Sequence, residues 1–189
     1  MVQTLRVAVR FAETLNDPEE GRNLIQSALD PIIGMSVWNL GLIVGMLMIG
    51  FGKTHSEPIQ LGPDKGRMRD VHDYHIHLQC PWRLLSDGKP ILKSGNDLMV
   101  GDSIDRHSDT ALATLKKVIG QGQHEVLSVS PEGTGGAVLF LSDSVKLRIY
   151  APLPGGEWRL FTYDPAPTYF VVERPTRGDY QGQLVIVSG

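Results

Sequence analysis

The stretch PIIGMSVWNLGLIVGMLMIGFG, residues 31–52, contains 22 residues without a charged side chain. A membrane-spanning helix needs about 20 apolar residues, and Gly41 and Gly45 have the spacing of small residues at membrane helix interfaces. Strands buried on both faces also read as continuous apolar runs. Five glycines, together with Trp38 and Asn39 inside the run, favour strands over a helix. We therefore predict two core strands, roughly 35–40 and 44–51, joined near residues 39–41, with a membrane span as the alternative.

The composition of the whole chain is that of an ordinary globular protein. Its 189 residues are 41% hydrophobic and 21% charged, and the formal net charge is -3. This length suits a single domain, 1–189, whose core forms without disulfides, and the composition excludes wholesale disorder. The acidic balance argues against a protein made mainly to bind nucleic acid. The single cysteine, Cys80, excludes an intramolecular disulfide and metal sites built from several cysteines.

The N-terminal part of the chain contains a clear helix signal. Asp17 is a good N-cap, Pro18 suits the first helical position, and apolar residues within 18–29 share one face. Pro31 stops the pattern, so we predict a helix over residues 18–29. Residues 4–12 alternate as in a strand but also fit one helix face, and the sequence does not decide between the two.

A second helix is expected between residues 105 and 120. Apolar residues over 111–119 recur at helical spacing, with lysines on the other side. Asp105 or Ser108 can cap the start, and Gly120 suits the left-handed position that ends many helices.

The remaining chain reads as short strands and turns. Glycines, a proline and charges at 53–70 predict a loop, and residues 82–85 could continue the strand before them beyond a bulge. The strands expected from alternation and flanking turns are 71–80, 89–93, 125–130, 136–141, 145–150, 157–163, 168–173 and 183–187. Their spacing of about ten residues after position 123 suggests an antiparallel meander. The predicted fold class is therefore α+β, mainly antiparallel sheet with two helices packed on it.

The strongest chemical signal is the group His72, Asp73, His75, His77 and Cys80. Most of these residue types are common transition-metal ligands. On a strand, His75 and His77 share a face with Asp73, whereas His72 and Cys80 lie on the other face. His75 and His77 could therefore hold one metal together, although the remaining ligands would have to come from elsewhere in the chain. The alternative is a solvent-exposed face with one hydrogen-bonded core histidine.

Other candidates for catalysis are weaker. Cys80 and His77 would point to opposite faces of the strand, so Cys80 is expected to be a buried apolar residue rather than a nucleophile. The glycines at 133–136 precede a predicted strand instead of a helix, which indicates a hairpin turn and not a phosphate loop. The chain contains no G-x-S-x-G motif. The sequence thus favours a protein that is not an enzyme and predicts no cofactor.

Two charged features have ordinary structural explanations. Lys65, Arg67 and Arg69 form a small basic run, which is expected to be a solvated loop. The pairs at 82–83 and 158–159 each place a tryptophan before an arginine, and cation–π contacts would follow if the two segments paired.

Residues 78–83, LQCPWR, preceded by Asp73 and His77, resemble a segment of an uncharacterised, largely actinobacterial protein family. The resemblance covers most of residues 20–173 and rests on short blocks. The family has no activity that could be transferred to individual residues. It implies a soluble cytoplasmic protein.

These observations lead to a prediction of function with two alternatives. We expect a non-catalytic protein-interaction module whose partner is another protein or a second copy, without nucleic acid or membrane. Residues 147–150 and 157–161 are similar to small domains suspected to be immunity proteins of bacterial toxins, which suggests that specific role by analogy of fold. The alternatives are a metal-dependent enzyme or sensor using His75 and His77, and a membrane-anchored protein using residues 31–52.

Overall fold

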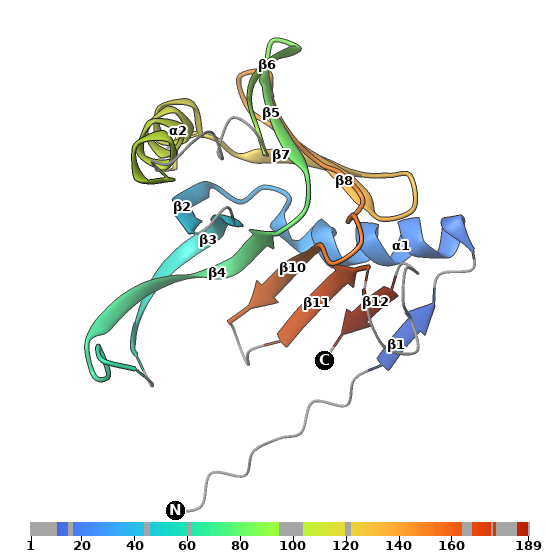
Figure 1. Ribbon diagram of the computed structural model, residues 1–189, viewed down its shortest axis with the longest axis horizontal. Coiled ribbons are helices and arrows are strands. Elements are labelled where there is room, and N and C mark those ends of the chain that lie inside the picture. The colour runs from blue at the N-terminus through green and yellow to red at the C-terminus, as the bar shows by residue number, and fades with distance from the viewer. Residues whose placement is uncertain are drawn as a thin grey trace, which may run out of the picture.

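The chain forms two antiparallel sheets and two α-helices (Figure 1). The computed structural model describes residues 11–14, 17–43, 46–59, 62–94, 104–119, 122–163, 168–174, 176 and 185–188. The seven-stranded sheet has the order β1 (Phe11–Thr14), β12 (Val185–Ser188), β11 (Thr168–Glu173), β10 (Glu157–Thr162), β4 (Met68–Leu78), β3 (Met46–Pro58) and β2 (Val37–Ile43). The five-stranded sheet has the order β6 (Lys89–Lys93), β5 (Trp82–Ser86), β9 (Val145–Ile149), β8 (Gly136–Leu141) and β7 (Val126–Glu132). The predicted α+β class is confirmed.

The first helix, α1 (Pro18–Leu29), has the predicted bounds. The carboxylate of Asp17 accepts a hydrogen bond of 2.8 Å from the Glu19 N–H and so caps the helix start. Pro31 lies in a short 3₁₀ turn, Asp30–Ile32, which follows directly. Ile25 and Leu29 are fully buried, so one face of α1 belongs to the core.

The uncharged stretch forms paired strands, as the glycines suggested. β2 and β3 are antiparallel neighbours, although their turn does not lie at residues 39–41 as predicted. Those residues lie inside β2, where the register shifts between Trp38 and Gly41. A local irregularity therefore accommodates the turn-like residues without ending the strand. Within the described part of the chain, no helix is long and apolar enough to cross a membrane.

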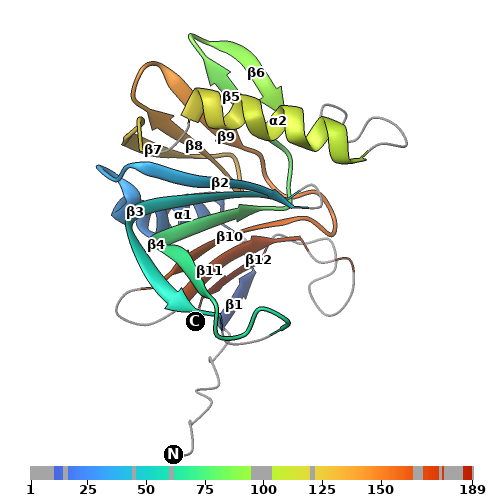
Figure 2. The ribbon, with the colours of Figure 1, turned by 90° about the vertical axis from the view of Figure 1, so that its left-hand side faces the viewer.

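The loop predicted at 53–70 is wrong over most of its length. β3 continues to Pro58 and β4 already begins at Met68, so the connection is confined to 59–67. The register shifts between Phe51 and Thr54, and beyond this point β3 and β4 pair with each other and with no other described strand. Figures 1 and 2 show the two strands running past the ends of their neighbours. We call residues 53–70 the arm.

Polar pairs across the two strands hold the arm together. The Ser56 hydroxyl donates to the Asp70 carboxylate at 2.9 Å, and the Arg69 guanidinium donates to Glu57 at 2.6 Å. Because these pairs replace burial on one face, the segment lacks the apolar alternation by which strands are recognised. This is the physical reason that the sequence reads as a loop.

The chain then crosses from one sheet to the other. β4 ends at Leu78, and β5 pairs with β9 of the five-stranded sheet instead of extending β4. The predicted meander is likewise divided, because β7, β8 and β9 stay in the five-stranded sheet while β10, β11 and β12 complete the larger one. The segments at 82–83 and 158–159 therefore lie in different sheets and do not pair.

The second helix, α2 (Ile104–Ile119), begins earlier than predicted. Asp105 and Ser108 lie within the helix and not at its cap. Leu115 and Ile119 are fully buried, as the apolar stripe predicted. Gly120 and residues 4–10 lie outside the described residues, so the ambiguity over 4–12 is resolved only where Phe11 begins β1.

One hydrophobic cluster joins both sheets and both helices. Trp82 and Trp158, from different sheets, are buried in it, and the Trp158 indole donates to the Gly135 carbonyl at 2.8 Å. On the seven-stranded sheet, Ile76, Leu78, Trp158 and Leu160 face this cluster. Figure 2 shows the opposite face of the sheet toward the viewer, with α1 behind it. We call that opposite face the open face.

Candidate binding surface

The open face is occupied by ring-bearing side chains of β4 and β10. Side chains alternate along a strand, so the residues between the core positions point to the open face. His75 lies opposite Phe161 and His77 opposite Arg159. The rings of His77 and Phe161 have centroids 4.8 Å apart, and those of His75 and Tyr163 5.2 Å apart. These rings are half-buried, and the ion pair of Arg159 with Glu157 lies beside them on the same face.

Asp73 is fixed where the arm leaves the sheet. One carboxylate oxygen accepts the Lys53 N–H at 2.7 Å, and the other is 2.6 Å from His55 Nε2. Gly52 has φ +85°, and a Cβ there would collide with the Asp73 carboxylate. Burial alone would raise the pKa of Asp73, but the hydrogen bonds from His55 and Lys53 outweigh it and lower this pKa. The pair therefore closes the bulge that separates the arm from the body.

Sequence reasoning missed His55. This residue lies 18 positions before Asp73 in a polar segment that was expected to be a loop. Only the pairing of the arm strands, with His55 opposite Val71, brings its imidazole to Asp73. If residues 53–58 had been predicted as a strand paired with residues 68–72, His55 would have been placed near Asp73.

His72 does not follow the simple alternation predicted for it. Its ring centroid is 5.4 Å from that of His75, and its backbone N–H donates to His75 Nε2 at 2.9 Å. The register shift at the bulge accounts for this approach, and Gly50 leaves the space for the His72 ring, since a Cβ at Gly50 would collide with it. His72 is 3% exposed, and its Nε2 atom has no hydrogen-bond partner among the described residues.

The three histidines of β4 favour the neutral state. Burial lowers the pKa of His75 to about 4, and the neighbouring His72 and His77 add to the effect. Burial also lowers the pKa of His72, against the opposing carboxylates of Asp70 and Asp73. The pKa of His77 is lowered by burial and by Arg159. These three histidines are therefore neutral at neutral pH, and Asp73 is the charged residue of this strand beside them.

The arrangement gives little support to the metal site proposed for His75 and His77. Their ring centroids are 6.3 Å apart in an edge-to-face arrangement, and His75 Nε2 already accepts the His72 N–H. Among the described residues, no group of three or more histidine, cysteine, aspartate or glutamate side chains could hold a metal ion. Metal binding by these two histidines stays a prediction from the sequence.

Cys80 lies apart from the histidines, in the core cluster. It is 6% exposed, and burial raises the pKa of its thiol to about 12. A thiol that stays protonated is a poor nucleophile, which agrees with the predicted apolar role. The glycines at 133–136 form the turn between β7 and β8, as predicted.

A small cavity lies beside the base of the arm. Its volume is about 240 Å³, and it is lined by His55, Glu57, Val71 and Tyr163. The polar side chains in its wall already have partners, because Glu57 binds Arg69 and His55 is hydrogen-bonded to Asp73. Val71 is buried and supplies an apolar surface. Of the basic run in the arm, Arg67 is paired with Asp64 at 2.7 Å.

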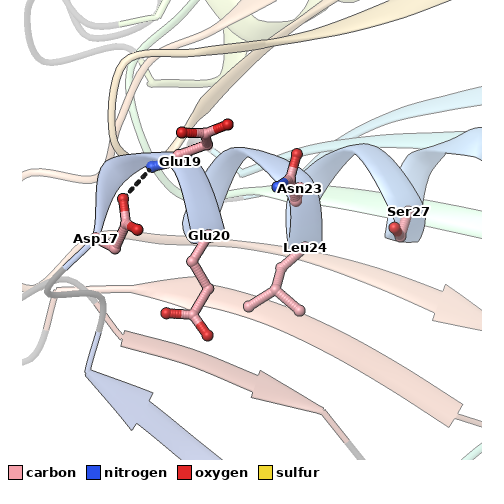
Figure 3. Close-up of a pocket in the computed structure, with 6 residues that line it drawn as sticks. All are labelled: Asp17, Glu19, Glu20, Asn23, Leu24 and Ser27. Atoms are coloured by element: carbon pink, nitrogen blue, oxygen red, sulfur yellow. Dashed lines mark hydrogen bonds between the residues drawn. The ribbon is translucent and has the colours of Figure 1, made fainter.

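A second hollow, of about 510 Å³, lies along the start of α1 (Figure 3). Glu20 and Leu24 point from the helix to one side, and Glu19 and Asn23 point to the other. Acidic residues in a first helical turn stabilise the positive end of the helix dipole. Helix capping therefore accounts for the acidic residues of this hollow, Asp17, Glu19 and Glu20.

Comparison with known proteins adds no relative. No family model matches the chain, and neither a curated protein nor a solved structure matches it. The resemblance of residues 78–83 to an actinobacterial family consequently stays a prediction.

Proposed function

We propose that the protein is a non-catalytic protein-interaction module that binds its partner on the open face and the adjoining side of the arm. The observation that carries this proposal is the row of half-buried, uncharged rings on the open face, from His77 and Phe161 to His75 and Tyr163. Apolar and aromatic surface that stays accessible is typical of protein-binding sites, where aromatic residues are enriched.

The arm supports the same proposal. Its residues 53–56 and 62–70 are exposed, including Met68, which is 61% exposed. An isolated two-stranded ribbon is only marginally stable in water. A ribbon that projects beside this row of rings can make contact with a partner from a second side.

The His55–Asp73 pair has a structural explanation in this proposal. Oriented imidazole–carboxylate pairs occur in catalytic sites. Here both carboxylate oxygens are used to close the bulge at Gly52, so the pair fixes the angle of the arm. The likeness to immunity domains suggests a bacterial toxin as the protein that binds this surface.

Two matched substitutions test the proposal. Phe161 lies half-buried on the open face, and Phe140 is a half-buried phenylalanine of the five-stranded sheet that packs against Lys146. We expect wild type and Phe140→Lys to retain a stoichiometric protein partner from native cells, and Phe161→Lys to lose it. Cross-linking with mass spectrometry should place the contacts on β4, β10 or the arm.

Several results would contradict the proposal. One is a partner held equally by Phe161→Lys, or cross-linked only to the five-stranded sheet. Another is wild-type protein that retains no partner while its fold, measured by circular dichroism, is intact.

A further inference from the structure

β4 has a neighbouring strand on each side in the body but on one side in the described part of the arm. In the body, the Asp73 carbonyl accepts the Tyr163 N–H at 3.1 Å, and β10 ends at Thr162. β4 continues for five more residues, 68–72, along which no described strand takes the place of β10. β4 therefore extends beyond its pairing with β10, toward the tip of the arm.

The pairing pattern shows which backbone groups point outward. The Ile59 N–H donates to the Arg67 carbonyl at 2.8 Å, so these two residues face each other across the arm. Because facing and outward residues alternate in an antiparallel pair, Met68 and Asp70 direct their N–H and C=O groups away from β3. Neither residue has a backbone hydrogen bond on that side among the residues that the structure describes. The N–H of His72, the next outward residue, is bound to His75 Nε2.

The cavity at the base of the arm lies beside this edge. Val71, in its wall, belongs to the same segment of β4, and Tyr163 directly follows β10. A strand added along residues 68–72 would place one side chain next to Val71, because neighbouring strands align their side chains on each face. Glu57 and His55 already have partners in Arg69 and Asp73, so the cavity suits a bulky uncharged side chain.

We propose that the partner binds as an extended strand along the unpaired edge of β4 at residues 68–72, with one bulky uncharged side chain, aromatic by preference, in the cavity beside Val71. This inference rests on the proposed function and names how that partner is recognised. Backbone hydrogen bonds to Met68 and Asp70 would supply affinity, and the cavity would supply specificity.

The charge of Asp70 favours a different protein over a second copy as the partner. Two copies that paired through this edge about a two-fold axis centred on Asp70 would bring the two Asp70 residues opposite each other. Like charges directly opposite each other destabilise a strand pair. The other arm edge, on β3, includes Pro58, which lacks an N–H group and so cannot donate to an added strand.

A displayed library of random linear peptides is a suitable probe, with enriched peptides measured by fluorescence anisotropy. The matched variants are Asp70→Pro and Ser56→Pro. These residues are partners in the arm, both direct their N–H outward, and either change breaks the same hydroxyl–carboxylate bond. We expect Asp70→Pro to weaken peptide binding about tenfold or more and Ser56→Pro to leave it nearly unchanged.

Two further measurements keep the test decisive if a proline variant unfolds the arm. In wild type, bound peptide should slow amide exchange at Met68 and Asp70 but not at Thr54 and Ser56. Replacing the enriched bulky residue of the peptide by alanine should weaken binding by about tenfold.

The proposal is overturned if no peptide is enriched, if both proline variants bind alike, or if exchange slows on the β3 edge. Peptides that bind equally to Asp70→Pro but not to Phe161→Lys would overturn strand addition while leaving the open face as the interaction surface.

Discussion

The hairpin of β3 and β4 has two ends in different surroundings. In the body, Ile76 of β4 is fully buried and lies between Ile49 of β3 and Leu160 of β10. In the arm, Met68 of the same strand is 61% exposed, and among the described strands it pairs with β3 alone. The body end therefore gains stability from burial, and the arm end from polar pairs across the strands. The arm therefore contributes little to the core, and its β4 edge has no neighbouring strand among the described residues.

The largest expected effect contrasts these two ends directly. Ile76→Ala should lower the free energy of unfolding by about 2–5 kcal/mol, since it leaves a cavity in the core. Met68→Ala, eight positions earlier on the same strand, should change it by less than about 0.5 kcal/mol. Urea unfolding followed by circular dichroism measures both. Equal losses would show that the arm end of the hairpin contributes as much to the core as the body end does.

An acid titration tests whether folding lowers the pKa of His75, which lies at the body end of β4. The unfolded chain protonates His75 near its ordinary pKa of 6.5, whereas the folded chain does so only at about 4. Below pH 6.5 the unfolded state therefore binds more protons, so stability falls as the pH decreases and levels off below about 4. The shift corresponds to a loss of up to about 3 kcal/mol.

His75→Gln provides the control for this titration, because an amide can still accept the His72 N–H. Its stability should change less than that of wild type between pH 6.5 and 4 in the same urea experiment. The lowered pKa of Asp73 acts in a separate window below its ordinary value of 3.8, where protonation would remove further stability. An identical pH dependence in His75→Gln would refute the assignment.

The contrast between the two ends also explains what the sequence could predict. Helix 18–29 was predictable because Asp17 and the apolar face are local signals that burial later reinforces. The strands at 31–52 were predictable because a buried strand lacks charges. The arm was not, because Glu57 and Arg69 stabilise each other from 12 positions apart and leave no periodic pattern.

Only part of the candidate surface could be predicted from the sequence. His75 and His77 share a face as alternation requires, with rings in contact. The position of His72 depends on a register shift, and that of His55 depends on the arm pairing. Both are tertiary effects that a local reading of residues 71–80 does not contain. The proposed binding edge was less accessible still, because the edge of β4 at residues 68–72 is defined by where β10 ends.

The smallest effect concerns the bulge at Gly52, which joins the two ends. Gly52 and Gly66 have nearly the same φ, +85° and +88°, but a Cβ at Gly66 would meet nothing within 4 Å. Gly66→Ala should therefore cost about 1 kcal/mol for backbone conformation alone. Gly52→Ala should cost roughly 1 kcal/mol more, because it also displaces the Asp73 carboxylate from Lys53 and His55. Urea unfolding gives the difference, and nuclear magnetic resonance of the His55 ring should report the lost contact only in Gly52→Ala. If the two variants lose equal stability and both retain that contact, Asp73 does not close the bulge, and the arm takes its angle from strand pairing alone.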